Sequence, residues 1–293
     1  MSEHHPIRGA LLCVTALALF ACMDTTTKFL AERYDVPLVV AVRYLGNLLL
    51  MVLVLGPAYG RRMAQTRRTG LVIVRGLCLA CASLMVGFAL QRLPVAEMTA
   101  ITFLAPILLV VVSGPVLGER PGPVGWAATL TGFAGVMLII RPGGGMALTG
   151  VLFALGAVAA NLSYQLLSRI LAATETTVAL LFYTALAGSI VFGLALPWFV
   201  SDRVPSLLEV ALFASLGVYG GLGHFLFTAA FRHAPASLLA PLNYLQLLWA
   251  GLLGWLVFGH FPDEVSLLGM AIVAGSGVLI ALKTRRPPPK RSA

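Results

Sequence analysis

The chain has 293 residues, of which 59% are hydrophobic and 11% are charged, and its mean hydropathy is +0.94. Soluble domains carry about 25% charged residues, so this composition excludes a soluble globular protein and indicates a chain surrounded by lipid. The net charge of +9 would favour nucleic-acid binding in a soluble protein, but here the basic residues indicate membrane topology and headgroup contacts. We expect the lipid bilayer as a partner and no nucleic acid.

Apolar runs of about 20 residues recur from one end of the chain to the other, and each is long enough to cross a bilayer once. Strands of a membrane barrel would instead alternate polar and apolar residues over short segments, so that class is excluded. The predicted fold is all-α and polytopic, with ten transmembrane helices. The spans cover residues 9–30, 38–56, 70–90, 95–117, 124–140, 148–167, 177–199, 206–231, 236–258 and 265–282.

The first span follows a short basic segment and continues to Leu30, which is too long for a cleaved signal peptide. The four cysteines all lie within apolar spans. Cys78 and Cys81 have the C-x-x-C spacing of redox or metal pairs, but no second pair and no neighbouring histidine accompanies them. We interpret them as small apolar packing residues, and no metal site or cofactor is predicted.

The fourth span carries the most informative pattern. The segment 94–121 is interrupted by Pro106 and Pro115, and a shift of 141 residues aligns it without gaps with the segment 235–262. Corresponding proline-interrupted spans in two halves of a transporter indicate its substrate site. Pro106, Pro115 and Pro241 are expected to act as hinges, because proline weakens the helical hydrogen bonding around it.

The same shift predicts two repeats of five spans each. The first repeat covers residues 9–141, the second covers 148–283, and the tail 284–293 is expected to be disordered in the cytoplasm. Five is an odd number, so the second repeat enters the membrane from the opposite face and the two repeats are inverted. Inverted repeats meet around a site near the membrane midplane and permit alternating access.

The distribution of Lys and Arg predicts the orientation. With the N-terminus inside, thirteen basic residues lie in cytoplasmic segments, five lie in outer segments and two lie inside spans. Because cytoplasmic segments are enriched in basic residues, both termini are expected on the cytoplasmic side of a bacterial-type inner membrane. Glycines four residues apart, such as Gly217 and Gly221, are interpreted as helix contacts within one chain, and we expect a monomer.

Five charged side chains inside spans or at their ends are candidate substrate or coupling groups, because ionisable groups are costly in a membrane. They are Asp24, Lys28, Arg43, Arg75 and Glu97. Asp24 and Arg43 lie at matching depths, so they form either an ion pair that fixes helix packing or a site for a proton or a substrate carboxylate. Arg75 is expected to extend toward the cytoplasmic interface. Glu97 is expected to be solvated at the outer mouth of the fourth span, or to gate or attract cations there.

Amides, hydroxyls and rings at mid-span depths must face protein or water, since lipid-facing surfaces are apolar. The predicted substrate cavity takes such residues from the fourth, sixth, eighth and ninth spans. They are Thr99, Thr102, Phe103, Asn161, Tyr164, Gln165, His224, Asn243, Tyr244, Gln246 and Trp249. Rings would hold the apolar part of an amphipathic substrate, and hydroxyls and amides would bind its polar end. Hydrogen bonding between helices is the alternative for each of them.

Residues 94–143, above all F-L-A-P-I-L-L-V-V-V-S-G-P-V-L-G-E-R-P-G-P-V-G-W, resemble the EamA repeat of the drug/metabolite transporter superfamily. The copy at 228–283 departs from it at His260, where the family has the glutamate seen at Glu119. The resemblance implies ten helices, a cavity lined mainly by spans 1, 3, 4, 6, 8 and 9, and no ATP-binding part. YddG-type amino-acid exporters are the members it favours, although the Met-Asp-Thr-Thr-Thr-Lys segment 23–28 also resembles small-metabolite importers.

We therefore expect an inner-membrane secondary transporter that moves small amphipathic metabolites by alternating access. Export of amino acids, including aromatic ones, is the leading function. Uptake of a metabolite or vitamin and efflux of drug-like cations are the alternatives, and protons are a candidate coupling ion. An intramembrane enzyme is disfavoured, because the chain has no H-E-x-x-H zinc motif on any span.

Overall fold

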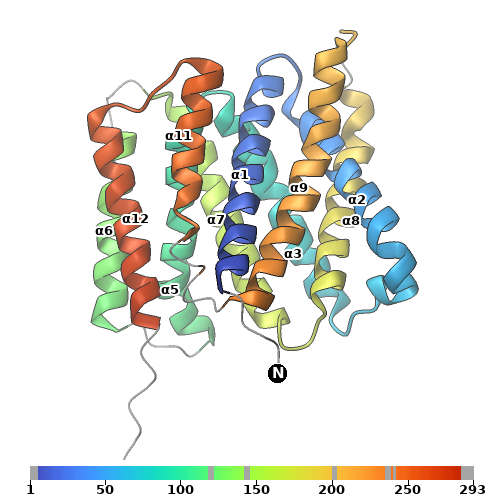
Figure 1. The fold of residues 1–293 in the computed structure, drawn as a ribbon, viewed down its shortest axis with the longest axis horizontal. Coiled ribbons are helices and arrows are strands. Elements are labelled where there is room, and N and C mark those ends of the chain that lie inside the picture. The colour runs from blue at the N-terminus through green and yellow to red at the C-terminus, as the bar shows by residue number, and fades with distance from the viewer. Residues whose placement is uncertain are drawn as a thin grey trace, which may run out of the picture.

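The computed structural model describes residues 6–117, 122–141, 146–199, 203–234, 239 and 242–284. Within these ranges every regular element is a helix, and the helices stand side by side in an antiparallel bundle (Figure 1). The helices are α1 (Pro6–Ala31), α2 (Val36–Tyr59), η1 (Gly60–Ala64), α3 (Thr69–Leu90), α4 (Val95–Thr102), α5 (Leu104–Leu117), α6 (Pro123–Ile140), α7 (Leu148–Leu171), α8 (Thr177–Ala195), η2 (Leu196–Trp198), α9 (Leu207–His233), α11 (Leu245–Phe258) and α12 (Glu264–Thr284). The predicted all-α class is confirmed.

Eight helical stretches of the described chain are long and apolar enough to cross a membrane, and the broken α4–α5 segment provides one of them. Two shorter apolar helices, Leu245–Phe258 and Glu264–Leu279, correspond to α11 and to most of α12. The chain is therefore a multi-pass membrane protein. The start of α1 and the end of α12 lie at the same end of the bundle (Figure 1).

The fourth span, predicted over residues 95–117, is interrupted, as its prolines led us to expect. α4 ends at Thr102, and α5 begins at Leu104. Pro106 explains the break, because its ring clashes with the carbonyl group of Thr102 and it has no N–H to donate to that carbonyl. Pro115 was wrongly expected to interrupt the span, since α5 continues past it to Leu117. Pro241, the third expected hinge, lies outside the described residues.

A second break occurs at the aligned place in the second half. Asn243 and Tyr244 form a turn, and α11 begins at Leu245, so α5 and α11 cover the same residues after the shift of 141. The ring of Phe103 in the first break lies against the ring of Tyr244 in the second, with centroids 4.9 Å apart. The two interruptions of the helical scaffold therefore meet each other inside the bundle.

Helix packing follows the same internal symmetry. The shift turns α1 into α7 and α3 into α9, and the structure packs α1 on α9 and α3 on α7. It also packs α2 on α9 and α3 on α8, which is again one contact and its shifted copy. The two repeats therefore build equivalent interfaces with each other.

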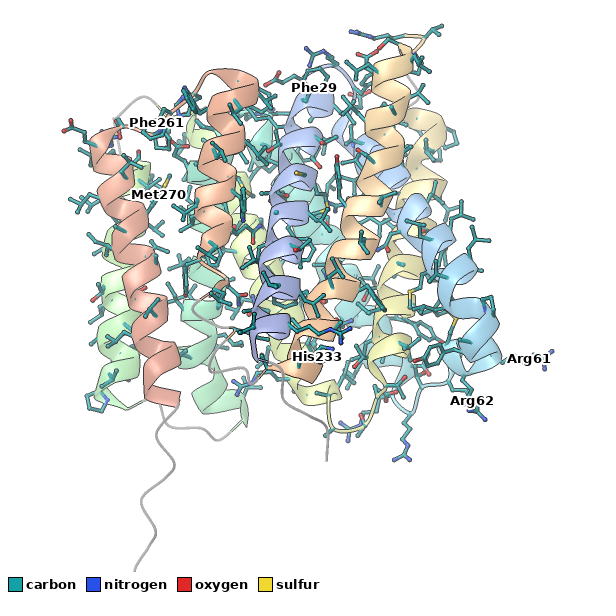
Figure 2. All side chains as sticks on the ribbon, viewed as in Figure 1. Phe29, Arg61, Arg62, His233, Phe261 and Met270 are labelled. Atoms are coloured by element: carbon teal, nitrogen blue, oxygen red, sulfur yellow. The ribbon has the colours of Figure 1, made fainter. Side chains whose placement is uncertain are left out.

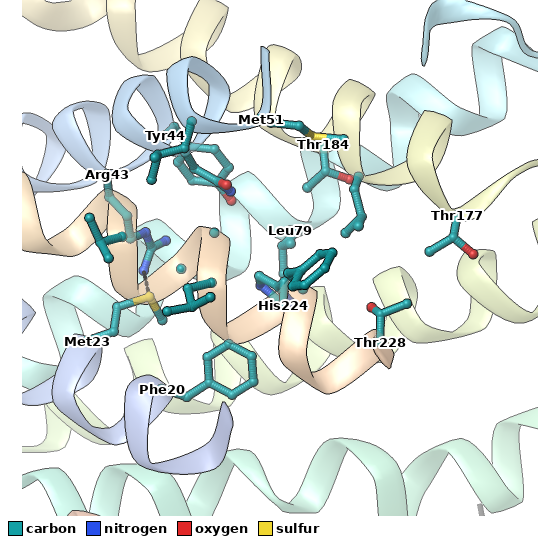
Figure 3. A pocket seen from close by; sticks show the side chains of 18 of the residues that line it. Phe20, Met23, Arg43, Tyr44, Met51, Leu79, Thr177, Thr184, His224 and Thr228 are labelled. Atoms are coloured by element: carbon teal, nitrogen blue, oxygen red, sulfur yellow. Dashed lines mark hydrogen bonds between the residues drawn. The ribbon is translucent and has the colours of Figure 1, made fainter. Parts of the chain in front are cut away.

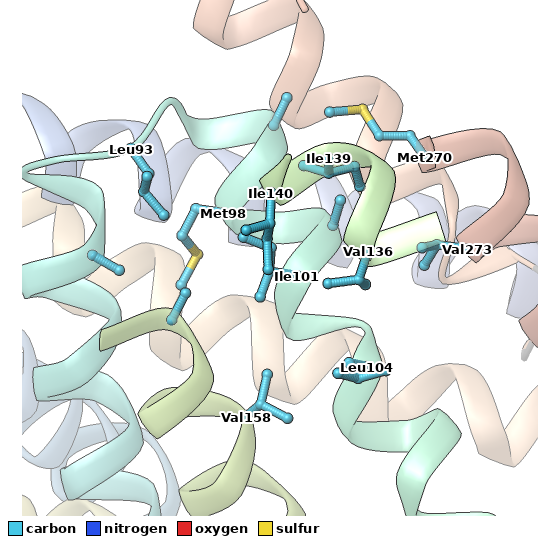
Figure 4. Packing of buried hydrophobic residues seen from close by; sticks show 14 of the residues in the cluster. Leu93, Met98, Ile101, Leu104, Val136, Ile139, Ile140, Val158, Met270 and Val273 are labelled. Atoms are coloured by element: carbon cyan, nitrogen blue, oxygen red, sulfur yellow. The ribbon is translucent and has the colours of Figure 1, made fainter. Parts of the chain in front are cut away.

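The bundle has a filled side and a hollow side. On the filled side, apolar side chains of α4, α5, α6, α7, α11 and α12 interdigitate (Figure 4). Met98, Ile101 and Ile139 lie at the centre of this cluster and are fully buried. The hollow side lies among α1, α2, α3, α7, α8 and α9.

α2 and α9 cross at two glycines, Gly46 and Gly217. A Cβ atom on Gly217 would lie 2.8 Å from the backbone of Gly46, so the two helices touch through their main chains. Replacing Gly217 with valine should therefore force the helices apart and lower the stability by about 1–3 kcal/mol, the usual cost of overpacking. Thermal unfolding of the purified protein in detergent measures this effect.

Gly193 on α8 provides the matched control, since no heavy atom lies within 4 Å of the position that a Cβ atom would take there. Gly193→Ala should leave the unfolding temperature unchanged or raise it, because glycine in an open helix position is less stable than alanine by about 0.5–1 kcal/mol. Equal losses in the two variants would contradict a close crossing at Gly217.

Candidate functional site

A cavity of about 680 Å³ occupies the hollow side of the bundle (Figure 3). Cavities of roughly 300–1,000 Å³ hold small organic molecules. Its polar lining comes from α1, α2, α3, α7, α8, α9 and the start of α11, and consists of Asp24, Arg43, Asn47, Ser83, Asn161, Thr177, Thr184, Thr228 and Gln246. The rings that line it are Phe20, Tyr44, Tyr59, Tyr164, His224 and Phe225. The cavity can therefore offer both apolar contact and hydrogen bonds to one ligand.

Arg43 is the charged group most available to a ligand. Its side chain is 9% exposed and extends from α2 into the cavity toward Met23 (Figure 3). Its guanidinium group makes a long contact of 4.0 Å with the Met23 sulfur and lies 5.3 Å from the centroid of the Tyr44 ring. A guanidinium group has five N–H donors, so donors remain for a ligand. Asp24 lines the same cavity from α1, where Arg43 and Gln246 face its carboxyl group.

Arg75 does not extend to the cytoplasmic interface as expected. It is 4% exposed and turns inward, where its guanidinium group donates to the Ser168 hydroxyl at 2.7 Å and to the Tyr164 and Thr184 hydroxyls at 2.8 Å. A fourth hydrogen bond reaches the Leu180 carbonyl at 3.0 Å. In the inward conformation the planar guanidinium group has four hydrogen-bond acceptors. These hydrogen bonds explain why the side chain does not extend toward the interface.

Four of the predicted cavity residues line the cavity, namely Asn161, Tyr164, His224 and Gln246. The His224 ring lies 4.9 Å from the ring of Phe20 on α1. The structure thus brings together polar groups that stand far apart in the sequence, from the sixth, eighth and ninth predicted spans.

The other predicted residues do not line this cavity. Thr99 and Thr102 donate their hydroxyl hydrogens to carbonyls of their own helix, at 2.7 Å each. Phe103 and Tyr244 stack on each other, and Trp249 packs beside the buried cluster around Cys13 on α1. The Asn243 side chain accepts a weak bond from the Cys13 thiol at 3.9 Å, and Gln165 is half-buried elsewhere on α7. The fourth predicted span belongs to the filled side instead.

Apart from Arg43, sequence reasoning missed the contribution of α2 and α8. Tyr44 and Asn47 follow Arg43 on α2, and the Tyr44 hydroxyl pairs with Ser83 of α3 at 3.0 Å. Thr184 of α8 joins the opposite wall. The expected lining by spans 1, 3, 4, 6, 8 and 9 is therefore wrong in part. The sequence signal for α2 was the pattern Arg-Tyr-x-x-Asn at residues 43–47, which places three polar groups on one helical face inside an apolar span.

One end of the bundle is closed beside the filled side. There the Lys28 ammonium group donates to the carbonyls of Leu90 and Leu93 at 2.8 and 3.2 Å and pairs with Glu32 at 3.4 Å. Gln91 donates to the Ala31 carbonyl at 2.6 Å. Lys28 thus ties α1 to the end of α3, where a cation is favoured by the helix dipole and by unpaired carbonyls.

Glu97 belongs to this closed end and is not solvated as expected. It is 2% exposed, and its carboxylate lies 3.1 Å from the Nε2 atom of His260, whose side chain is 46% exposed. The second oxygen of Glu97 has no hydrogen-bond partner among the described residues. The contact joins α4 to the segment between α11 and α12, where the sequence has histidine in place of the repeat's glutamate.

A further ion pair at the closed end joins Arg141, at the end of α6, to Asp263, before α12. The hydrogen bond from Arg141 and the backbone N–H of Ser266 lower the pKa of Asp263 to about 2. The cavity reaches the other end of the bundle, because Tyr59 and Thr177 line it. Figure 2 places Arg61, Arg62 and His233 at that end and Phe29 and Phe261 at the closed end.

Comparison with known proteins decides the family. The model of the EamA-like transporter family matches residues 7–141 and again residues 148–282. The chain belongs to the EamA-like transporter family. The resemblance to drug/metabolite transporters is thereby confirmed, and the names of the family and of its relatives indicate transporters rather than enzymes.

Curated relatives of this EamA-like protein include transporters with different cargo. A riboflavin transporter of Rhizobium johnstonii is 30% identical over 93% of this chain and 90% of its own length. A pseudopaline exporter of Pseudomonas aeruginosa is 27% identical over 90% of this chain and 93% of its own length. An S-adenosylmethionine uptake transporter of Rickettsia bellii is 26% identical over 80% and 79%. A solved crystal structure with 23% identity, covering 95% of this chain and 99% of its own, shares the fold with a TM-score of 0.67.

Proposed function

We propose that this protein is an inner-membrane secondary transporter that moves small amphipathic metabolites by alternating access. Amino acids, including aromatic ones, are the leading substrates, and export is the leading direction. The observation that carries the proposal is one cavity that holds Asp24 and Arg43 together with rings and uncharged polar groups. Such a lining matches a molecule that has charged groups at one end and an apolar body at the other.

The chemistry of binding follows from this lining. The carboxylate of an amino acid would accept hydrogen bonds from Arg43, whose side chain extends into the cavity. Its ammonium group would lie near Asp24 and the amide of Gln246. Phe20 and Phe225 would contact the apolar side chain.

Uptake of a metabolite or vitamin is the second candidate, and two observations favour it. The cavity of about 680 Å³ lies in the range of roughly 300–1,000 Å³ that holds drug-sized ligands, so it is larger than a single amino acid requires. Two of the relatives are also named for molecules larger than an amino acid, namely riboflavin and S-adenosylmethionine. Amino-acid export and uptake of a larger metabolite make different predictions in one transport assay.

We further propose ten membrane crossings, with α11 and α12 as the ninth and tenth, in two inverted repeats of five. Both termini would then lie in the cytoplasm, where the basic residues are concentrated. The cavity reaches the same end as the N-terminus, and the Glu97–His260 contact closes the other. The conformation is therefore assigned as inward-facing, and the breaks at Phe103 and Tyr244 are the points where α4–α5 and α11 bend during the cycle.

Purified protein in liposomes tests the proposal. Radiolabelled phenylalanine, riboflavin and S-adenosylmethionine should be compared in counterflow, which detects exchange whichever direction is physiological. Faster movement of phenylalanine than in empty vesicles supports the leading candidate, and movement of riboflavin or S-adenosylmethionine alone supports the second. If a broader panel of amino acids and metabolites also exchanges no faster than in empty vesicles, the transport proposal is wrong.

A further inference from the structure

The charges at the cavity do not balance. Asp24 is the one acidic residue among the described residues that line it, and the positive charge of Arg43 faces it. Arg75 adds a second positive charge directly behind the wall formed by Tyr164 and Thr184. In the described part of the chain, the four acceptors of the Arg75 guanidinium group are all neutral. The Asp24–Arg43–Arg75 set therefore carries one excess positive charge.

This charge acts on the contents of the cavity through Tyr164. The Tyr164 oxygen accepts from Arg75 at 2.8 Å, and the guanidinium group also lies over the Tyr164 ring, 4.3 Å from its centroid. No described residue accepts the hydroxyl hydrogen of Tyr164, so it can donate to a ligand in the cavity. A hydroxyl that accepts from a cation is a stronger donor, because hydrogen bonds in a chain polarise one another.

Thr184 differs from Tyr164 in this respect. Its hydroxyl also accepts from Arg75, but its own hydrogen is donated to the Leu180 carbonyl at 2.7 Å. The Tyr164 hydroxyl therefore has a hydrogen that it can donate into the cavity, whereas Thr184 holds the guanidinium group in place.

Burying Arg75 without a counterion is costly, because a charge removed from water needs an opposite charge or very good hydrogen bonding. Walls of low dielectric constant focus such a field into the space they enclose. We propose that this cavity selects substrates with a net negative charge. Such a substrate has a further carboxylate, in addition to the carboxylate and ammonium groups bound by Arg43 and Asp24. This further carboxylate lies against Tyr164, in front of Arg75. The inference rests on the proposed function, and it deepens it by naming the charge class of the substrate.

The proposal separates the candidate substrate classes. An amphipathic molecule with more carboxylates than amines should bind best, a zwitterion less well and a cation least. Efflux of drug-like cations would require the opposite order, since like charges brought together in a cavity of low dielectric constant repel each other.

Charged thiol reagents measure the potential of the cavity without knowledge of the substrate. Cys13, Cys22, Cys78 and Cys81 are first replaced by serine or alanine, and Asn161→Cys then provides a thiol one helical turn from Tyr164. The rates of modification by a negatively and a positively charged methanethiosulfonate are measured in the full-length protein. Their ratio is divided by the ratio for a small free thiol in solution.

We expect the normalised ratio to favour the anionic reagent, and Arg75→Gln to lower it on the order of tenfold, as for unit charges roughly 12 Å apart at an effective dielectric constant near 20. Arg75→Lys keeps the charge and should keep the ratio. A normalised ratio at or below one, or a ratio that Arg75→Gln leaves unchanged, overturns the proposal. If Arg75→Gln does not fold, the ratio in the parent protein still decides between the two outcomes.

Protection of the same cysteine by ligands tests the order of binding. 4-Carboxyphenylalanine, phenylalanine and 4-aminomethylphenylalanine share the ring and the amino and carboxyl groups of an amino acid, and carry a net negative, no net and a net positive charge. Protection should be strongest for 4-carboxyphenylalanine and weakest for 4-aminomethylphenylalanine, and the reverse order would contradict the proposal. Both readouts are independent of flux, so a failure of the charge selection and a failure of transport in liposomes are distinguished.

Discussion

The double variant D24N/R43Q should fold as well as the parent protein and yet transport nothing. Each single variant leaves one charge of the cavity without the opposite charge that faces it, which should cost less than the about 3–5 kcal/mol lost when a direct buried ion pair is broken. Removing both charges removes that penalty. The binding groups for the two ends of a zwitterion are then absent, so transport should fall below detection. Thermal unfolding in detergent and counterflow in liposomes provide the two measurements.

This cycle decides between the two interpretations of Asp24 and Arg43. If the two residues serve helix packing alone, the double variant should recover transport together with stability. The double variant R141Q/D263N is the matched control, since it removes one arginine and one aspartate charge at the closed end, away from the cavity. It should retain transport, and a loss as complete as that of D24N/R43Q would show that the effect is not specific to the cavity.

Glu97→Gln should open the closed end of the bundle. The Glu97 carboxylate is buried and contacts His260 at 3.1 Å, and hydrogen bonds that involve a charged group contribute about 1.5–3 kcal/mol. Losing that contribution should move the equilibrium between the closed and open forms by about tenfold or more. A cysteine at Leu93, which is 1% exposed beside this contact, should then react faster with a membrane-impermeant maleimide by a similar factor.

His260→Glu tests the same contact from the other side. It restores the residue that the first repeat has at Glu119, but it places two carboxylates against each other, so labelling at position 93 should increase further. Glu264→Gln is the control, because this exposed residue lies four positions away and makes the same chemical change. Unchanged labelling in both Glu97→Gln and His260→Glu would mean that the contact does not hold this end shut.

The sequence predicted the scaffold well because its signals are local. Apolar length identified the spans, and the gapless shift of 141 residues identified two copies whose helices α5 and α11 coincide after the shift. The break near Pro106 was also foreseeable, because a proline removes one donor and excludes one carbonyl wherever it stands. The break lies at Phe103, three residues before Pro106, because the proline excludes the carbonyl group of Thr102 from the helical hydrogen bonding.

The lining of the cavity was harder to predict, because the direction of a side chain depends on neighbours from other helices. Asn161 and Gln246 were identified because an amide in an apolar span needs a polar partner. Thr99 satisfies that need within its own helix, and nothing in the sequence distinguishes the two cases. Arg75 was misplaced because its four acceptors come from α7 and α8, which the sequence separates from it by about 90 to 110 residues.

The contact between Phe103 and Tyr244 has a consequence for the origin of the chain. The two residues are the same position of the two copies, and they touch each other. In a symmetric dimer, a residue meets its own counterpart only where it lies on the twofold axis. If a single repeat once assembled as an antiparallel pair, one aromatic residue at this position would have contacted its twin. Fusion into one chain then allowed the two rings to diverge, into a phenylalanine and a tyrosine with a hydroxyl of its own.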